Sequence, residues 1–328
     1  MVYHKKWIAS AAILAILAAF PAAAKTLRMA GNFPADHSSS QAMDRFAETV
    51  TKASNGDLEI ANFPAMQLGG AQENVDQVKS GVIFGTWIGA AYLSGNVPEI
   101  EAVSLPFVYP DRETAFRVID GEVGDALNER LAEKGFLPLG WMELGSRNVT
   151  NSVRPVSTVE DLKGLKIRLQ PNETHIATFR ALGANPVSMG IAEVYSALQQ
   201  GVLDGEENPY SVIKSRNFNE VQKYVSDTNH FFDFIVLVVN RDQFEALPKV
   251  QQQLLREAAA DAVAWQRETA RAEDETAREA LIAAGMEFTE ITDEARARMQ
   301  EASAPVIEGL RQRVDLELID RVLEEAAK

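Results

Sequence analysis

Arg168 is the residue of this sequence best placed to bind an acid. It lies in the segment GLKIRLQPNETH, where alternating leucine and isoleucine side chains predict a short buried strand. Asn172 is a favourable N-cap for a helix that follows. Open α/β sheets hold their ligands at the carboxyl ends of strands, and an arginine there can grip a carboxylate at two points. The alternative is a solvated charge on a strand edge, the usual place of an arginine.

The segments around Arg168 follow one another in a specific order. GLKIR is followed by a predicted helix, then by GANP, and then by EVYSALQQGVLDGEENP, which ends at Pro209. This order and spacing resemble the solute-binding proteins of TRAP transporters, the DctP family, and the resemblance extends along nearly the whole chain. In that family, the arginine of G-L-K-x-R forms a salt bridge with the carboxylate of the substrate, and Arg168 occupies this position. The resemblance therefore implies a periplasmic protein that binds an organic acid and needs no cofactor.

The resemblance adds Arg147 and Asn208 to the candidate site. Members of the family that bind larger acids have an arginine at the place of Arg147, just before the segment NVTNS. It could equally be a surface arginine in a loop after Gly145. Asn208 matches an asparagine that donates a hydrogen bond to the same ligand, although it is also suited to a turn before Pro209.

Residues of the N-terminal half and one phenylalanine complete the candidate site. Asn32 and His37 lie in a loop where the family places polar ligand contacts, and His37 could instead cap the next helix. Glu73 would accept hydrogen bonds from ligand hydroxyls, or it is simply an acid in the first turn of a helix. Trp87 and Phe232 would form walls of the pocket, with the hydrophobic core as the alternative for each.

The aromatic residues leave the shape of the pocket open. Some relatives have an aromatic residue two positions before the glutamate of E-V-Y, where this chain has Ile191. A stacking platform for a sugar ring is therefore lost, or is supplied by Phe232 or Trp87. Phe231, Phe232 and Phe234 alternate along one extended segment, so one should face the cleft and its neighbours the core.

Two classes of acid fit these residues. A C4-dicarboxylate needs two cationic anchors, for which Arg168 and Arg147 are candidates. A uronate or aldonate needs one anchor and partners for its hydroxyl groups. We favour the sugar acid, because a second carboxylate near Glu73 would be repelled.

Motifs for catalysis and for metal binding are missing from the sequence. It has no cysteine, and no pair of its four histidines has the spacing of a zinc site. It has no G-x-S-x-G, no phosphate-binding P-loop and no G-x-G-x-x-G. We therefore expect a binding protein rather than an enzyme. A secreted lyase or hydrolase built from distant carboxylates is a remote alternative, and a module that presents the ligand to a sensor kinase is another.

The N-terminal segment and the charge of the chain bound its location and partners. Lys5 and Lys6, an apolar run over 7–20 and the alanines at 22–24 predict a signal peptide cleaved after Ala24, hence export to the periplasm. The formal charge is −15, or −17 without the two N-terminal lysines, which argues against nucleic acid and anionic lipid as partners. An anion site must then be built from a few local arginines. The resemblance implies the integral membrane subunits of a TRAP permease as partners.

The order of predicted elements indicates a doubly wound α/β fold. Predicted strands at 26–31, 58–63 and 82–88 alternate with helices, which is typical of parallel sheets. With the resemblance, this predicts a two-lobed periplasmic binding protein of the type II-like, Venus-flytrap kind. We expect a signal peptide at 1–24, lobe I at 25–145 with 234–272, and lobe II at 146–233 with 273–328.

Two long segments are expected to connect the lobes. Residues 223–240 form an extended run rich in Val, Phe and Ile, long enough to leave one lobe and enter the other as a hinge strand. Residues 249–284 contain neither Gly nor Pro and would form a helix about 54 Å long. A coiled coil is disfavoured because alanine dominates its apolar stripe. One long helix spans both lobes in TRAP binding proteins, and we expect the same here.

Overall fold

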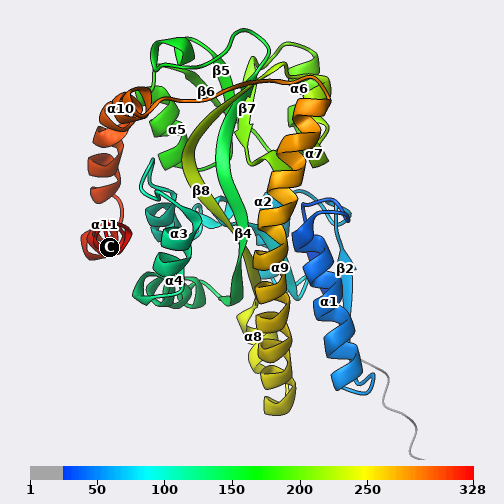
Figure 1. Ribbon diagram of the computed structural model, residues 1–328. Coiled ribbons are helices and arrows are strands. Elements are labelled where there is room, and N and C mark those ends of the chain that lie inside the picture. The colour runs from blue at the N-terminus through cyan, green and yellow to red at the C-terminus, as the bar shows by residue number, and fades with distance from the viewer. Residues whose placement is uncertain (1–24) are drawn as a thin grey trace, which may run out of the picture.

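The computed structural model describes residues 25–328, so the predicted signal peptide lies outside the described residues. Nine strands of this region form one mixed sheet in the order β2-β1-β3-β8-β4-β7-β5-β6, with β9 paired to β8 (Figure 1). The strands are β1 (Lys25–Gly31), β2 (Leu58–Phe63), β3 (Gly85–Gly89), β4 (Phe136–Asn151), β5 (Lys166–Leu169), β6 (Asn185–Ser188), β7 (Gly205–Asn208), β8 (Tyr224–Asn240) and β9 (Glu287–Thr289). We call the part built on β1–β3 lobe I and the part built on β5–β7 lobe II.

Helices cover the sheet in both lobes. Lobe I carries α1 (Ser38–Ala53), α2 (Ala71–Lys79), α3 (Arg112–Ile119), α4 (Glu122–Glu133), α8 (Arg241–Glu245) and the short 3-10 helices η1 (Ala90–Leu93) and η2 (Pro98–Ser104). Lobe II carries α5 (Glu173–Ala181), α6 (Ile191–Gln199), α7 (Tyr210–Ser215) and the short 3-10 helices η3 (Glu160–Leu162) and η4 (Phe218–Glu220). The chain ends with α9 (Lys249–Ala283), α10 (Asp293–Arg311) and α11 (Leu316–Ala326). The two-lobed α/β architecture predicted from the sequence is confirmed.

The strands β4 and β8 run through both lobes and pair with each other antiparallel. The long extended segment that ends at Asn240 is thus a hinge strand, as predicted. β4 is continuous through Gly145, although the sequence also allowed a loop after this residue and we expected the boundary between the lobes there. Gly145 instead lies at a bulge within one continuous strand, with φ of 113°, a conformation that favours glycine. A glycine that accommodates a bulge cannot be distinguished in the sequence from one that ends a strand.

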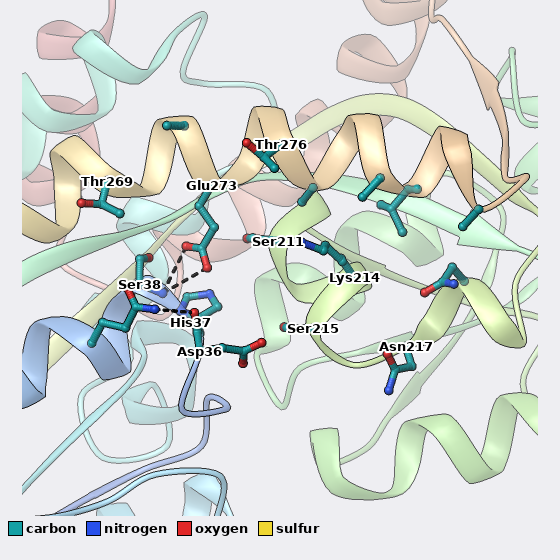
Figure 2. A pocket seen from close by; sticks show the side chains of 17 residues that line it. Asp36, His37, Ser38, Ser211, Lys214, Ser215, Asn217, Thr269, Glu273 and Thr276 are labelled. Carbon is teal, nitrogen blue, oxygen red and sulfur yellow. Dashed lines mark hydrogen bonds between the residues drawn. The ribbon is translucent and has the colours of Figure 1, made fainter.

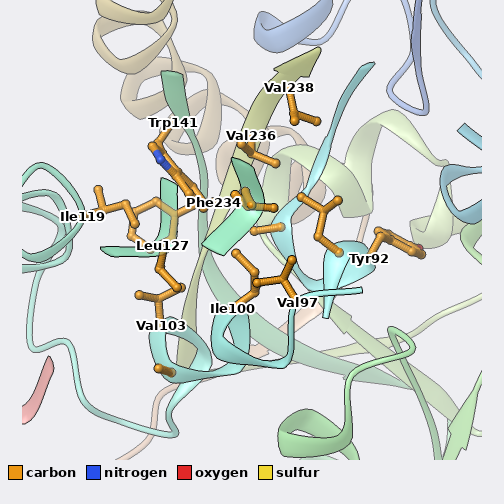
Figure 3. Close-up of a cluster of buried hydrophobic side chains, with 14 of the residues drawn as sticks. Tyr92, Val97, Ile100, Val103, Ile119, Leu127, Trp141, Phe234, Val236 and Val238 are labelled. Carbon is orange, nitrogen blue, oxygen red and sulfur yellow. The ribbon is translucent and has the colours of Figure 1, made fainter. Parts of the chain in front are cut away.

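The buried apolar side chains form four clusters, two in each lobe. In one lobe I cluster, Trp141 of β4 and Phe234 of β8 meet the side chains of η2, α3 and α4 (Figure 3). Phe232 belongs to the same cluster and packs edge to face against Phe116. Phe231, on the opposite face of β8, packs in lobe II against the ring of His175.

The long helix α9 joins the lobes along one side of the molecule (Figure 1). It packs on α1 and β4 of lobe I and on α7 of lobe II. Two consecutive acids of α9 accept hydrogen bonds from main-chain amides in the first turns of α1 and α7. Glu273 accepts a hydrogen bond from the Ser38 amide at 3.1 Å, and Asp274 accepts one from the Ser211 amide at 3.0 Å. Negative side chains are favourable at helix N-termini, so α9 is fixed to one helix of each lobe.

The C-terminal helices return from lobe II to lobe I. Ala295 and Met299 near the start of α10 pack in the lobe II core. Leu310 at its end, together with Ile319 and Val322 of α11, packs in the lobe I core. The expected assignment put 273–328 in lobe II. The amphipathic pattern of a helix shows which face is buried, but it does not show which lobe covers that face.

No helix among residues 25–328 is both long enough and apolar enough to span a membrane.

Gly205 offers a test of how closely β7 packs against β4. An ideal Cβ at this residue would lie 2.0 Å from the main-chain oxygen of Thr150, which cannot move without breaking the sheet. We expect Gly205→Ala to lower the free energy of unfolding by about 2 kcal/mol or more. Gly309→Ala in α10 is the control, because nothing lies near its Cβ and alanine should stabilise the helix by up to about 1 kcal/mol. Urea unfolding of both variants measures this, and equal effects would contradict it.

Candidate ligand-binding cleft

Arg168, the third residue of β5, lies completely buried where the lobes meet. Its Nε donates to the main-chain oxygen of Met189 in lobe II at 2.9 Å, and its Nη2 donates to the hydroxyl of Tyr92 in lobe I at 3.1 Å. Its Nη1 is buried without a hydrogen-bond partner. The following residues behave as predicted, since the Asn172 side chain caps α5 by accepting from the His175 amide at 3.0 Å. The fold therefore holds a buried guanidinium in place while leaving part of it free to bind an anion.

Two cavities with shared lining residues lie between the lobes. Arg168 lines neither, but its hydrogen-bond partner Tyr92 lines both of them and its partner Met189 lines the larger one. The inner cleft has a volume of about 20 Å³ and is lined by Asn32, Phe33, Gly89, Tyr92 and Leu144 of lobe I and by Gln170, Ile191, Asn208, Val212 and Arg216 of lobe II. The outer cleft has a volume of about 430 Å³ and shares Tyr92 and Ile191 with the inner one. Gln72, Glu73, Ser188 and Glu193 are among its lining residues. A polar inner end and a wider outer end are thus joined at Tyr92.

The inner cleft contains further polar atoms without partners. The side-chain oxygens of Asn32 and Gln170 are buried and accept no hydrogen bond. Nη1 of Arg168 likewise donates none. Buried polar groups of proteins are nearly always paired. The arrangement can therefore bind a small molecule that has an anionic group and one or more hydroxyl donors.

Asn208 lines the inner cleft and contacts a buried acid, Glu206. The Asn208 amide donates to Glu206 Oε2 at 2.5 Å, and the Thr150 hydroxyl donates to Glu206 Oε1 at 2.8 Å. Burial raises the pKa of Glu206 to about 7, since the hydrogen bond from Asn208 and the charge of Arg168 only partly oppose it and the charge of Glu207 adds to it. At neutral pH the carboxyl group next to the cleft is therefore partly protonated.

Arg147 lies in a buried ion-pair network and lines neither cleft. Its Nε and Nη2 donate to the two carboxylate oxygens of Glu207 at 2.5 and 2.7 Å, and its Nη1 donates to Asp233 at 3.3 Å. Nε2 of His230 lies 3.1 Å from the Glu207 carboxylate. Burial opposes the charge of Arg147, but Glu207 and Asp233 outweigh it and hold the pKa of Arg147 above its usual range. The network joins β4, β7 and β8.

His37 faces a separate groove on the side of α9. As the N-cap of α1, it accepts a hydrogen bond from the Ser39 amide at Nδ1, while its buried Nε2 has no partner. The groove has a volume of about 750 Å³ and lies between the start of α1, α7 and α9. Figure 2 shows Glu273 reaching from α9 toward Ser38, with His37 beside them. The structure therefore does not bring His37 into either cleft between the lobes.

The remaining predicted residues divide between the outer cleft and the core. Glu73 lies at the outer cleft, and its exposed side chain accepts a hydrogen bond from the Gly70 amide at 2.8 Å, which caps its own helix. Trp87 is completely buried in the core of lobe I, where its indole N–H donates to the Ser40 hydroxyl at 3.3 Å. Phe232 also lies in the core, as described above. Ile191, where some relatives have an aromatic residue, lines both clefts.

Three polar residues of the inner cleft, Gln170, Tyr92 and Arg216, were not predicted from the sequence. Gln170 follows Arg168 by two residues, so the alternation of a strand could have placed both side chains on one side. Tyr92 and Arg216 gave no such signal, because η1 and the end of α7 are irregular in sequence. Within residues 25–328, no three His, Asp or Glu side chains are grouped closely enough to hold a metal ion.

The chain is similar to known proteins over most of its length. Residues 29–313 match the model of "Bacterial extracellular solute-binding protein, family 7", DctP. The chain is 36% identical over 286 residues to the 2,3-diketo-L-gulonate-binding periplasmic protein YiaO of Escherichia coli, covering 86% of this chain and 87% of that one. It is 32% identical over 280 residues to the C4-dicarboxylate-binding periplasmic protein DctP of Rhodobacter capsulatus, covering 85% and 84%.

A solved structure shares the whole architecture. The sugar acid binding protein DctPAm of Advenella mimigardefordensis, in complex with galactonate, superposes with a TM-score of 0.90 at 31% identity, covering 93% of this chain and 98% of that one.

The raised pKa of Glu206 predicts how stability depends on pH. A proton is bound more tightly in the folded protein, so the free energy of unfolding should fall as pH rises from the ordinary value of 4.5 to about 7. Glu206→Gln mimics the protonated acid and should remove up to about 3 kcal/mol of this decline. Urea unfolding between pH 4 and pH 8 compares the two proteins. Parallel pH profiles for them would contradict the assignment.

The two buried arginines should respond differently to replacement by methionine, which has a similar length. Arg147→Met leaves Glu207 and Asp233 without their partner and should lower the free energy of unfolding by about 3–5 kcal/mol. Arg168→Met removes a cation that has no ion pair, and we expect a change within about 1 kcal/mol. Unfolding by urea without ligand measures both. A larger loss for Arg168→Met than for Arg147→Met would reverse the proposed roles.

Proposed function

The chain belongs to family 7 of the bacterial extracellular solute-binding proteins, and we propose that it binds a sugar acid between its lobes and delivers it to a TRAP permease. Members of this family bind and transport solutes rather than convert them, and they act in the periplasm. We further propose that residues 1–24 direct export and are cleaved after Ala24. The integral membrane subunits of the permease are the proposed partners.

The observation that carries the proposal is the unpaired Nη1 of the buried Arg168. A buried charge is costly unless it is paired and hydrogen-bonded, and a carboxylate at this point would supply both. Arg168 also contacts Tyr92 of the other lobe, so an acid bound there would touch both halves of the protein. Its differential affinity for the closed arrangement would then stabilise closure.

Several features support a sugar acid. The outer cleft offers Gln72, Ser188 and two exposed carboxylates, Glu73 and Glu193, as partners for hydroxyl groups. A second carboxylate beside these two acids would be repelled. Asn32 and Asn208 could bind hydroxyls nearer the anchor. A named binder of 2,3-diketo-L-gulonate and a complex with galactonate are among the similar proteins. The alternative is a C4-dicarboxylate, as in the name of the Rhodobacter capsulatus relative.

The proposed roles of the other candidates follow from their contacts. Arg147 has a structural role rather than a direct contact with the ligand, because its donors are occupied by Glu207 and Asp233. Trp87 and Phe232 shape the lobe I core behind the cleft, and His37 fixes the start of α1.

A thermal-shift and calorimetric screen tests the anchor and the ligand class. We expect galactonate or glucuronate at 100 times its Kd to stabilise the protein by about 2.7 kcal/mol, a shift of several degrees. Arg168→Ala should weaken binding by about 30-fold or more, since it removes one partner of a desolvated charge pair. Arg180→Ala is the control, because that arginine is exposed on α5 of the same lobe.

The outcomes separate the alternatives. Stabilisation only by succinate or malate would retain the anchor and replace the sugar acid by a dicarboxylate. If no acid binds, or if Arg168→Ala binds as the wild type does, the proposed function is wrong.

A further inference from the structure

Arg216 is an arginine of the inner cleft that has no role in the function proposed above. It follows α7 directly and reaches across the cleft, where Nη2 donates to the main-chain oxygen of Asn32 in lobe I. It lines the inner cleft together with Tyr92 and Asn208. Its neighbours Ser215 and Asn217 line the groove beside α9. Arg216 therefore forms the wall between the ligand cleft and that groove.

The electrostatic surroundings of Arg216 are unusual for this acidic protein. Among the described residues it forms no ion pair, and neither does Arg168, although acids outnumber bases in the chain by 15. Burial lowers the pKa of Arg216, and the positive charge of Arg168 lowers it further. Both cations lie around Tyr92, since Arg168 donates to its hydroxyl and Arg216 lines the inner cleft with it, and both have only neutral partners. Like charges at close range repel, and a shared anion would remove this cost.

We propose that Arg216 and Arg168 bind the same carboxylate from two sides, and that Arg216 thereby helps determine the specificity of the site. This inference rests on the proposed function and adds a second anchor to it. The ligand class is an acid with one carboxylate in the inner cleft and a hydroxylated remainder in the outer cleft.

The dimensions of the two cavities favour one shared carboxylate over two separate ones. At about 20 Å³, the inner cleft is close to the space of a single water molecule, so it must widen to take even one carboxylate and is much too small for two. The outer cleft is far larger, but Glu73 and Glu193 line it and would repel a second acid. The rest of the ligand therefore fits in the outer cleft, where Glu73 and Glu193 can accept hydrogen bonds from its hydroxyl groups.

The contact between Arg216 and Asn32 gives the second anchor a role in closure. A main-chain oxygen is a neutral acceptor, and a carboxylate is a stronger one for a guanidinium. An acid held by Arg168 would therefore compete with Asn32 for Arg216, or share it. Because Arg216 belongs to lobe II and Asn32 to lobe I, this exchange links occupation of the anchor to the position of the lobes.

Isothermal titration with galactonate, glucuronate and succinate tests the second anchor in the protein from Lys25 onward. We expect Arg216→Ala to weaken binding of the sugar acid by about 10-fold or more, without a change in Tm of the ligand-free protein. Arg216→Lys keeps the charge but not the fork of donors and should recover only part of the loss. Lys214→Ala is the matched control. Lys214 is a cation of α7, but it lines the groove beside α9 rather than the inner cleft.

A double-mutant cycle identifies the shared carboxylate. If Arg168 and Arg216 hold one group, the effects of Arg168→Ala and Arg216→Ala on sugar-acid affinity will be clearly non-additive. Additive effects, or a loss confined to succinate, would mean separate subsites and overturn the proposal. Wild-type or tighter binding by Arg216→Ala would also overturn it and leave Arg216 as a contact between the lobes. The absence of any acid binding in the folded wild type would instead show that the proposed function itself is wrong.

Discussion

The buried ion pair between Arg147 and Glu207 is the interaction on which the arrangement of the cleft depends. It joins β4 to β7, and its extension to Asp233 and His230 includes β8. Both lobes are built on these strands. Because Arg147 pairs with Glu207 and Asp233, and Glu206 is held by Asn208 and Thr150, none of these three carboxylates pairs with Arg168. The protein therefore keeps an available cation at its centre although acids surround it.

The elements that position this cation were predictable from local sequence. Alternating apolar residues defined the strand of Arg168, Asn172 capped the next helix, and the lack of Gly and Pro marked α9 within one residue of its observed end. Such features depend on neighbours in the chain, so periodicity and capping rules apply to them.

The parts that were not predictable depend on distant contacts. Arg147 meets Glu207 and Asp233 at separations of 60 and 86 residues, and no local pattern distinguishes this burial from a surface loop. The same limit applies to Arg216, which meets Asn32 at a separation of 184 residues, and to α11, whose apolar face gave no indication of its lobe. A loop after Gly145 was open as an alternative because a bulge within a strand leaves only a glycine as its trace in the sequence.

The return of the C-terminal helices to lobe I has a mechanical consequence. Together with β4, β8 and α9, this segment makes four chain connections between the lobes, spread across the width of the molecule. Such connections resist twisting and sliding, and they leave bending about one axis as the soft motion. Opening of the lobes would then bend all four segments together. The elastic stiffness of these segments would therefore contribute to the free-energy difference between the open and closed forms. Ligand affinity is in this sense partly a property of segments that never touch the ligand.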